Sequence, residues 1–215
     1  MSQAEVTANE PAAAQRDWMR IALALLVATV AYNLIEAGLA LWSGVSARSV
    51  VLVGFGLDSL IECVAAGVLL WRLRLERQGA DAETLEHAER RVHRVVGVTF
   101  FALAAYVVGQ AAWTFFGGDA PEESWLGIAL AIASLVIMPL VAWGKLRAAA
   151  KIGSGALRAE AKETLACTYL SFTLLLGLGA NALFGWWWAD PVAALAMVPW
   201  LIREGREGFE DQCPG

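Results

Sequence analysis

The chain has 215 residues, of which 58% are hydrophobic and only 17% are charged. This composition excludes an intrinsically disordered chain and, with its long apolar segments, favours an integral membrane protein over a soluble domain. The formal net charge of −5 comes with no signal for nucleic-acid binding, and an odd number of only three cysteines argues against a disulfide framework.

Six apolar segments reach or approach the length of about 20 residues that a membrane-spanning helix needs. They are residues 18–42, 50–71, 95–116, 125–143, 164–184 and 191–202. The last segment is the shortest, but Asp190 and Pro191 are typical of an N-cap and a first helical residue. The sequence therefore predicts an all-α, polytopic membrane protein with six transmembrane helices.

The basic residues indicate how these helices cross the membrane. Of the 16 lysine and arginine residues, only Arg48 falls on the opposite side from the others, which is a strong positive-inside bias. We therefore expect both termini in the cytoplasm and a multi-pass location in the plasma membrane. Residues 1–17 lack a signal-peptide pattern and are predicted to be a disordered tail, followed by a membrane domain at 18–208 and a short tail at 209–215.

Two acidic residues stand out inside the second apolar segment. Asp58 and Glu62 lie four residues apart, which places both on one face of a helix. Carboxylates are costly in hydrocarbon and usually mark an ion or proton path. The alternative is a buried polar pair that caps another helix.

Glu163 and Cys167 repeat this four-residue spacing at the start of the fifth segment. Counting about 1.5 Å per residue along two antiparallel helices pairs Asp58 with Cys167 and Glu62 with Glu163, with an offset that brings Glu163 nearer the cytoplasmic mouth. The four side chains are therefore the predicted ligands of one metal ion. As alternatives, Glu163 is an interfacial carboxylate paired with a neighbouring basic residue, and Cys167 is a small packing residue.

Three more polar residues are candidates for a proton path or for the mouth of the site. Glu36 lies one turn after Asn33 in the first segment, where it either serves a proton path or forms a hydrogen bond between helices. Glu160 lies on the same face as Glu163, and we expect it to be a solvated residue at the cytoplasmic mouth.

The connection between the second and third segments contains both histidines, His87 and His93. They are candidates for a second metal site. The alternative is that each belongs to a solvated pair with a glutamate four residues earlier on a helix.

Several of these residues resemble the motifs of the cation diffusion facilitator family. Residues 57–62 (LDSLIE) are similar to that family's second-helix signature, and Asp190 with Pro191 is similar to the opening of its sixth helix. Glu163 and Cys167 occupy the place of its fifth-helix pair. The resemblance covers roughly residues 18–208 and not the family's usual cytoplasmic C-terminal domain, so the chain looks like a short member.

The resemblance implies a six-helix exporter that exchanges a divalent metal cation, commonly Zn²⁺, for protons and that is usually a dimer. Here a homodimer would have to form through the transmembrane helices. Zinc-transporting members commonly have histidine and aspartate where this chain has Glu163 and Cys167, so the metal stays open. A thiolate favours Zn²⁺ or Cd²⁺, whereas the carboxylates suit Mn²⁺, Fe²⁺ or Co²⁺ as well.

Physical chemistry also predicts the coupling to protons. Carboxylates close together in a low-dielectric cavity favour protonation when the site is empty, and a metal ion must displace those protons. No ATP-binding or catalytic motif is evident, so we expect gradient-driven transport and no enzymatic activity. Two alternatives are a non-transporting, metal-binding membrane protein that modulates a partner, and a proton-coupled exporter of small organic cations that uses Glu62 as its exchanging acid.

Overall fold

The computed structural model describes residues 3–77, 82–117 and 120–210. Six helices make up nearly all of this part of the chain, and no strand occurs in it. They are α1 (Gln3–Ser46), α2 (Val50–Arg77), α3 (Ala82–Phe116), α4 (Trp125–Ile152), α5 (Gly155–Phe184) and α6 (Ala189–Glu210). The predicted all-α class and the six helices are therefore confirmed.

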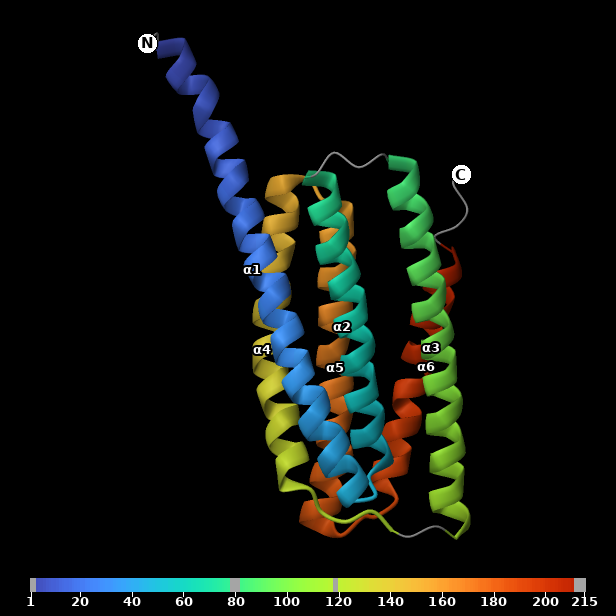
Figure 1. Ribbon diagram of the computed structural model, residues 1–215. Helices are drawn as coiled ribbons and strands as arrows, with labels where there is room; N and C mark the ends of the chain where they lie inside the picture. The colour runs from blue at the N-terminus through green and yellow to red at the C-terminus, as the bar shows by residue number, and fades with distance from the viewer. Residues whose placement is uncertain (1–2, 78–81, 118–119, 211–215) are drawn as a thin grey trace.

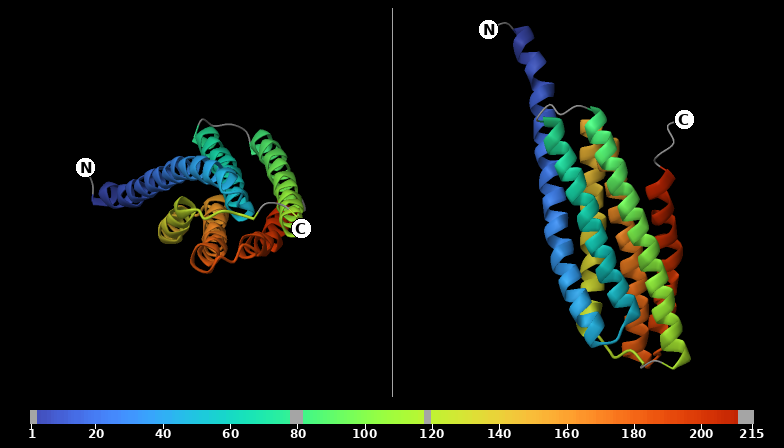
Figure 2. Two further views of the ribbon diagram at one scale, coloured as in Figure 1. Left: turned by 90° about the horizontal axis from the view of Figure 1, so that it is seen from below. Right: turned by 45° about the vertical axis from the view of Figure 1, so that its right-hand side comes forward.

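The helices run up and down in one bundle (Figure 1). Helix α1 begins and α6 ends at the same end of this bundle, which we call the terminal end. The closest pairs are α1 with α2, α3 with α6, and α4 with α5, and α2 also contacts α3, α5 and α6. Figure 2 shows this arrangement along the bundle axis. Side chains of α2, α5 and α6 can therefore meet in the interior.

Segments of five helices are long and apolar enough to cross a membrane. They are Asp17–Ser46, Val50–Arg72, Gly97–Phe116, Trp125–Ile152 and Gly155–Phe184. Large apolar side chains such as Ile35, Trp113 and Phe116 face outward, as expected of a surface in contact with lipid. The chain is thus an integral, multi-pass membrane protein. Helix α6 does not meet the criterion because its last turns are charged, but it packs within the same bundle.

Four helices, α1, α3, α5 and α6, begin earlier than the apolar segments suggested. Helix α1 begins at Gln3, and the domain bounds, with a disordered tail at 1–17 and a membrane domain at 18–208, stay a prediction. Helix α5 begins at Gly155 because the Ser154 hydroxyl caps it by accepting a hydrogen bond from the Leu157 amide at 3.2 Å. Hydrophobicity marks the membrane-embedded part of a helix, whereas capping residues mark its end.

Asp190 was expected to be the N-cap of the sixth helix, and this expectation is wrong. Helix α6 begins one residue earlier, at Ala189. The Asp190 carboxylate instead accepts hydrogen bonds from the Ser49 hydroxyl and, at 3.1 Å, from the Val51 amide. It therefore satisfies the free amides at the start of α2 and fixes α6 to that end of α2.

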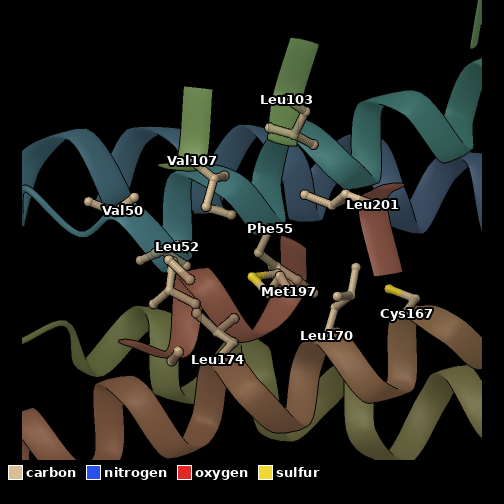
Figure 3. Close-up of a cluster of buried hydrophobic side chains, with 14 of the residues drawn as sticks. Val50, Leu52, Phe55, Leu103, Val107, Cys167, Leu170, Leu174, Met197 and Leu201 are labelled. Carbon is tan, nitrogen blue, oxygen red and sulfur yellow. The ribbon is translucent and has the colours of Figure 1, made fainter. Parts of the chain in front are cut away.

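The largest cluster of buried apolar side chains has members on all six helices, most of them on α2, α3, α5 and α6 (Figure 3). Phe55, Leu170, Leu174 and Met197 are almost completely buried in it. Cys167 belongs to the same cluster and is completely buried. The thiol therefore lies where the apolar interior meets the polar side chains described next.

Candidate metal site

The interior of the bundle brings together two carboxylates and a thiol from two helices. One ligand atom each from Asp58 and Glu62 of α2 and from Cys167 of α5 lie within 4.8 Å of one another. Tetrahedral ligands at about 2.0–2.3 Å from a shared ion lie roughly 3.3–3.8 Å apart, so small side-chain movements would complete the set around a cation. The four-residue spacing on α2 produces this arrangement because it places both acids on the face turned to α5.

The two acids of this cluster have different surroundings. Asp58 is 3% exposed, and its carboxylate has no hydrogen-bond partner among the described residues. Glu62 accepts a hydrogen bond of 2.7 Å from the side-chain amide of Asn33 on α1. Asn33 therefore orients Glu62, and Asp58 is left with its full capacity to bind a cation or a proton.

Glu163 is near this cluster but not part of it. It lies one turn before Cys167 on α5 and, with Asp58 and Glu62, lines one cavity. The other residues lining the cavity are Ile61, Ala65, Phe100, Ala166, Trp200 and Glu204. Glu163 makes no ion pair with another described residue, so the alternative of an interfacial pair is not seen in the structure.

Helix α6 adds an acid to the cavity, Glu204, that the sequence analysis did not identify. Glu204 follows the predicted sixth span and is next to Arg203, so the hydropathy pattern does not place it inside the membrane. The signal that was available is its position seven residues after Met197, because residues seven apart share one face of a helix and Met197 is buried.

Glu36 lies outside the cavity, in a buried network of hydroxyl groups. It is 1% exposed and accepts hydrogen bonds from the Ser134 hydroxyl and, at 3.0 Å, from the Ser59 hydroxyl. The Tyr32 hydroxyl is 2.8 Å from that of Ser134. This network joins α1, α2 and α4, and its member Ser59 follows Asp58 in the chain.

Glu160 was expected to be a solvated residue at the mouth, and this expectation is wrong. It is 8% exposed and lies 2.6 Å from the ammonium group of Lys145, which is completely buried and also donates to the Thr164 hydroxyl at 2.9 Å. Glu160 is covered because α4 and α5 continue to pack against each other beyond their apolar segments. Both charges are therefore enclosed between these two helices.

The two histidines proposed as a second metal site lie in the first turns of α3, at the terminal end of the bundle. The side chains of His87 and His93 fall outside the residues whose side chains the structure describes. The second metal site therefore stays a prediction.

The sequence of the chain is similar to those of known proteins. The model of the cation efflux transmembrane domain matches residues 26–211. The chain is 30% identical over 203 residues to an uncharacterized transporter of Synechocystis sp., which covers 90% of this chain and 66% of that protein. It is 26% identical over 183 residues to metal tolerance protein 4 of Oryza sativa subsp. japonica, which covers 79% of this chain and 44% of that protein.

The chain thus spans slightly less than two thirds of the first relative and less than half of the second. The chain therefore belongs to the cation efflux family, which is the cation diffusion facilitator family that its membrane motifs resemble.

Proposed function

We propose that the chain transports divalent metal cations across a membrane and holds the ion between Asp58, Glu62 and Cys167. The observation that carries this proposal is the convergence of three ligand atoms within 4.8 Å, from α2 and α5, in the interior of a membrane bundle. Membership of the cation efflux family supports it. Intramembrane acids without a permanent cationic partner are costly, so their presence is explained best by a cation that enters and leaves.

The ligand set indicates which cations bind best. Two carboxylates and one thiolate combine hard and soft donors, which suits Zn²⁺ and accepts Cd²⁺, whereas Mn²⁺ and Fe²⁺ gain less from a thiolate. The fourth position on a tetrahedral ion is open to water or to Glu163. We propose Zn²⁺ as the transported ion, with Cd²⁺, Co²⁺, Mn²⁺ and Fe²⁺ as the panel against which selectivity is measured.

Protons are the proposed counter-substrate. When no metal is bound, adjacent carboxylates in an apolar interior are stabilised by protonation, and metal binding releases those protons. The Asn33 amide contacts one oxygen of Glu62, which leaves the other oxygen for a proton or a metal ion. Glu36, which accepts a hydrogen bond of 3.0 Å from Ser59, is the proposed additional residue of the proton path.

The proposal also includes the orientation of the chain in the membrane, its location and its oligomeric state. The terminal end of the bundle is assigned to the cytoplasm on the distribution of basic residues. The plasma membrane as location and a homodimer through the transmembrane helices remain predictions from the sequence.

The test is metal flux into liposomes that contain the full chain and an ion-sensitive dye, measured across this panel of cations. Asp58→Asn should abolish flux because it removes a charged ligand, whereas Glu123→Gln, an exposed acid in a connection, should leave it unchanged. Metal binding without flux would favour the non-transporting alternative. Flux of organic cations that survives Cys167→Ser would favour the other alternative, and metal flux indifferent to a pH gradient would contradict the proton coupling.

A further inference from the structure

The cavity of the metal site separates α2 from α5 and α6 on the terminal side of the bundle. Along α2 its lining residues lie between Asp58 and Ala65, and along α5 they are Glu163 and Ala166, which precede Cys167. Because α2 runs toward the terminal end and α5 runs away from it, the cavity extends from the metal site in the terminal direction (Figure 1). Helix α6 also lines this cavity.

On the other side of the metal site, the same helices pack closely. We call the end of the bundle opposite the terminal end the far end (Figure 1). A methyl group added to Gly177 of α5 would lie 2.6 Å from the Cβ of Ala193 of α6, so these two helices approach each other closely. A methyl group added to Gly127 of α4 would lie 2.7 Å from Leu52 of α2 and 2.6 Å from Leu178 of α5. Helices α2, α5 and α6 are therefore held together toward the far end.

A buried polar contact joins α6 to α2 at the far end. Asp190, in the first turn of α6, is completely buried, and its carboxylate accepts hydrogen bonds from the Ser49 hydroxyl and, at 3.1 Å, from the Val51 amide. Ser49 directly precedes α2 and is 1% exposed. Hydrogen bonds to a charged group are stronger than those between neutral groups, and a buried acceptor that loses its donors is costly. The contact therefore favours the state in which α6 lies against the start of α2.

We propose that the contact of Asp190 with Ser49 and Val51 is the far-end gate of the transporter. The inference rests on the proposed function and adds the step by which a bound ion leaves the inner site. While the contact is intact, α6 holds the start of α2 near α5, because α6 itself packs closely on α5. When the contact breaks, α2 separates from α5 and α6 on the far side of Cys167, and the water that enters solvates the freed carboxylate. Asp190 thus positions helices and does not bind the ion.

The first test measures how often the far end opens. Leu178→Cys places a thiol eleven residues past Cys167 on α5, about 16 Å closer to the far end and away from the terminal cavity. Its rate of reaction with a polar thiol reagent is measured on the full chain in detergent, and mass spectrometry distinguishes it from the native cysteines. Asp190→Ala, added to this variant, should raise the rate about 10-fold or more, because the closed state loses two hydrogen bonds.

A matched control separates gating from general destabilisation. Ser43→Ala removes a buried hydrogen bond of 2.8 Å to the Ser124 hydroxyl at the same end, but this bond joins α1 to the N-cap of α4 and should leave the rate unchanged. Ser49→Ala keeps the contact with Val51 and should give a smaller increase, so it serves as the test if Asp190→Ala does not fold. The proposal is overturned if neither gate variant raises the rate, or if Ser43→Ala raises it equally.

The second test holds the gate closed. The double variant Ser49→Cys with Asp190→Cys, bridged by a short reducible bifunctional thiol reagent, should lose metal flux in liposomes and regain it on reduction. Cd²⁺ should still bind to the bridged chain, seen as the ultraviolet absorbance of sulfur-to-cadmium charge transfer at Cys167. The unaltered chain, treated with the same reagent, should keep its flux.

The two tests also separate the gate from the proposed function. A bridged chain that transports as fast as the reduced one would overturn the gate and leave metal transport established. An unaltered chain without metal flux would instead overturn the proposed function. The reaction rate of Leu178→Cys needs no transport, so it would still decide whether the Asp190 contact keeps the far end closed.

Discussion

The buried ion pair between Lys145 and Glu160 allows a quantitative test of how α4 and α5 are held together. The ammonium nitrogen and a carboxylate oxygen are 2.6 Å apart, and the two side chains are 0% and 9% exposed. Replacing Lys145 with methionine keeps the length of the side chain but leaves the Glu160 carboxylate buried without a cation. Breaking a buried pair in this way costs about 3–5 kcal/mol. For a chain of this size, that loss lowers the melting temperature by roughly 6–20 °C.

The measurement is thermal unfolding of the full chain in detergent, followed by circular dichroism. The double variant Lys145→Met with Glu160→Gln should recover much of the loss, because it no longer leaves a charge buried alone. Lys162→Met, which removes an exposed lysine from α5, is the matched control and should cost less than about 0.5 kcal/mol. A single variant that melts like the unaltered chain, or a double variant no more stable than the single one, would refute this account.

Two more substitutions test how the site is positioned. Asn33→Ala removes the hydrogen bond that orients Glu62, so the affinity for Zn²⁺ measured by calorimetry should fall about 10- to 100-fold, and an unchanged affinity would contradict this role. Gly177→Ala places a methyl group 2.6 Å from the Cβ of Ala193, where α5 meets α6, and should destabilise the bundle by about 1–3 kcal/mol. Gly179→Ala has open space around it and serves as the control, and equal melting temperatures for the two glycine variants would show that the close approach is unimportant.

Helix geometry explains why much of the site was predictable from the sequence. A four-residue step fixes a common face, and counting the rise per residue on two antiparallel helices placed Asp58 beside Cys167. The structure brings both of them together with Glu62. Glu163 lies one turn away from this group, in the direction that the same counting indicated.

The burial of Glu160 and of its partner Lys145 was not predictable from the apolar segments. Both residues lie beyond those segments, where hydropathy indicates solvated helix ends. Their burial comes from the packing of α4 on α5, which extends past the hydrophobic runs and encloses the two charged side chains. Hydropathy reports how a residue partitions into lipid, but it does not report which neighbouring helix covers that residue.

The position of the site within the bundle also restricts how an ion can cross. The acids occupy the cavity, which extends toward the terminal end, whereas Leu170 and Leu174 continue from Cys167 along α5 into the apolar cluster (Figure 3). Phe55 of α2 belongs to the same cluster. A desolvated divalent cation gains no ligand among these side chains, so the apolar cluster is a barrier in this conformation. The proposed transport therefore requires α2 and α5 to separate on the far side of Cys167, so that the ion bound there becomes accessible from the opposite end of the bundle.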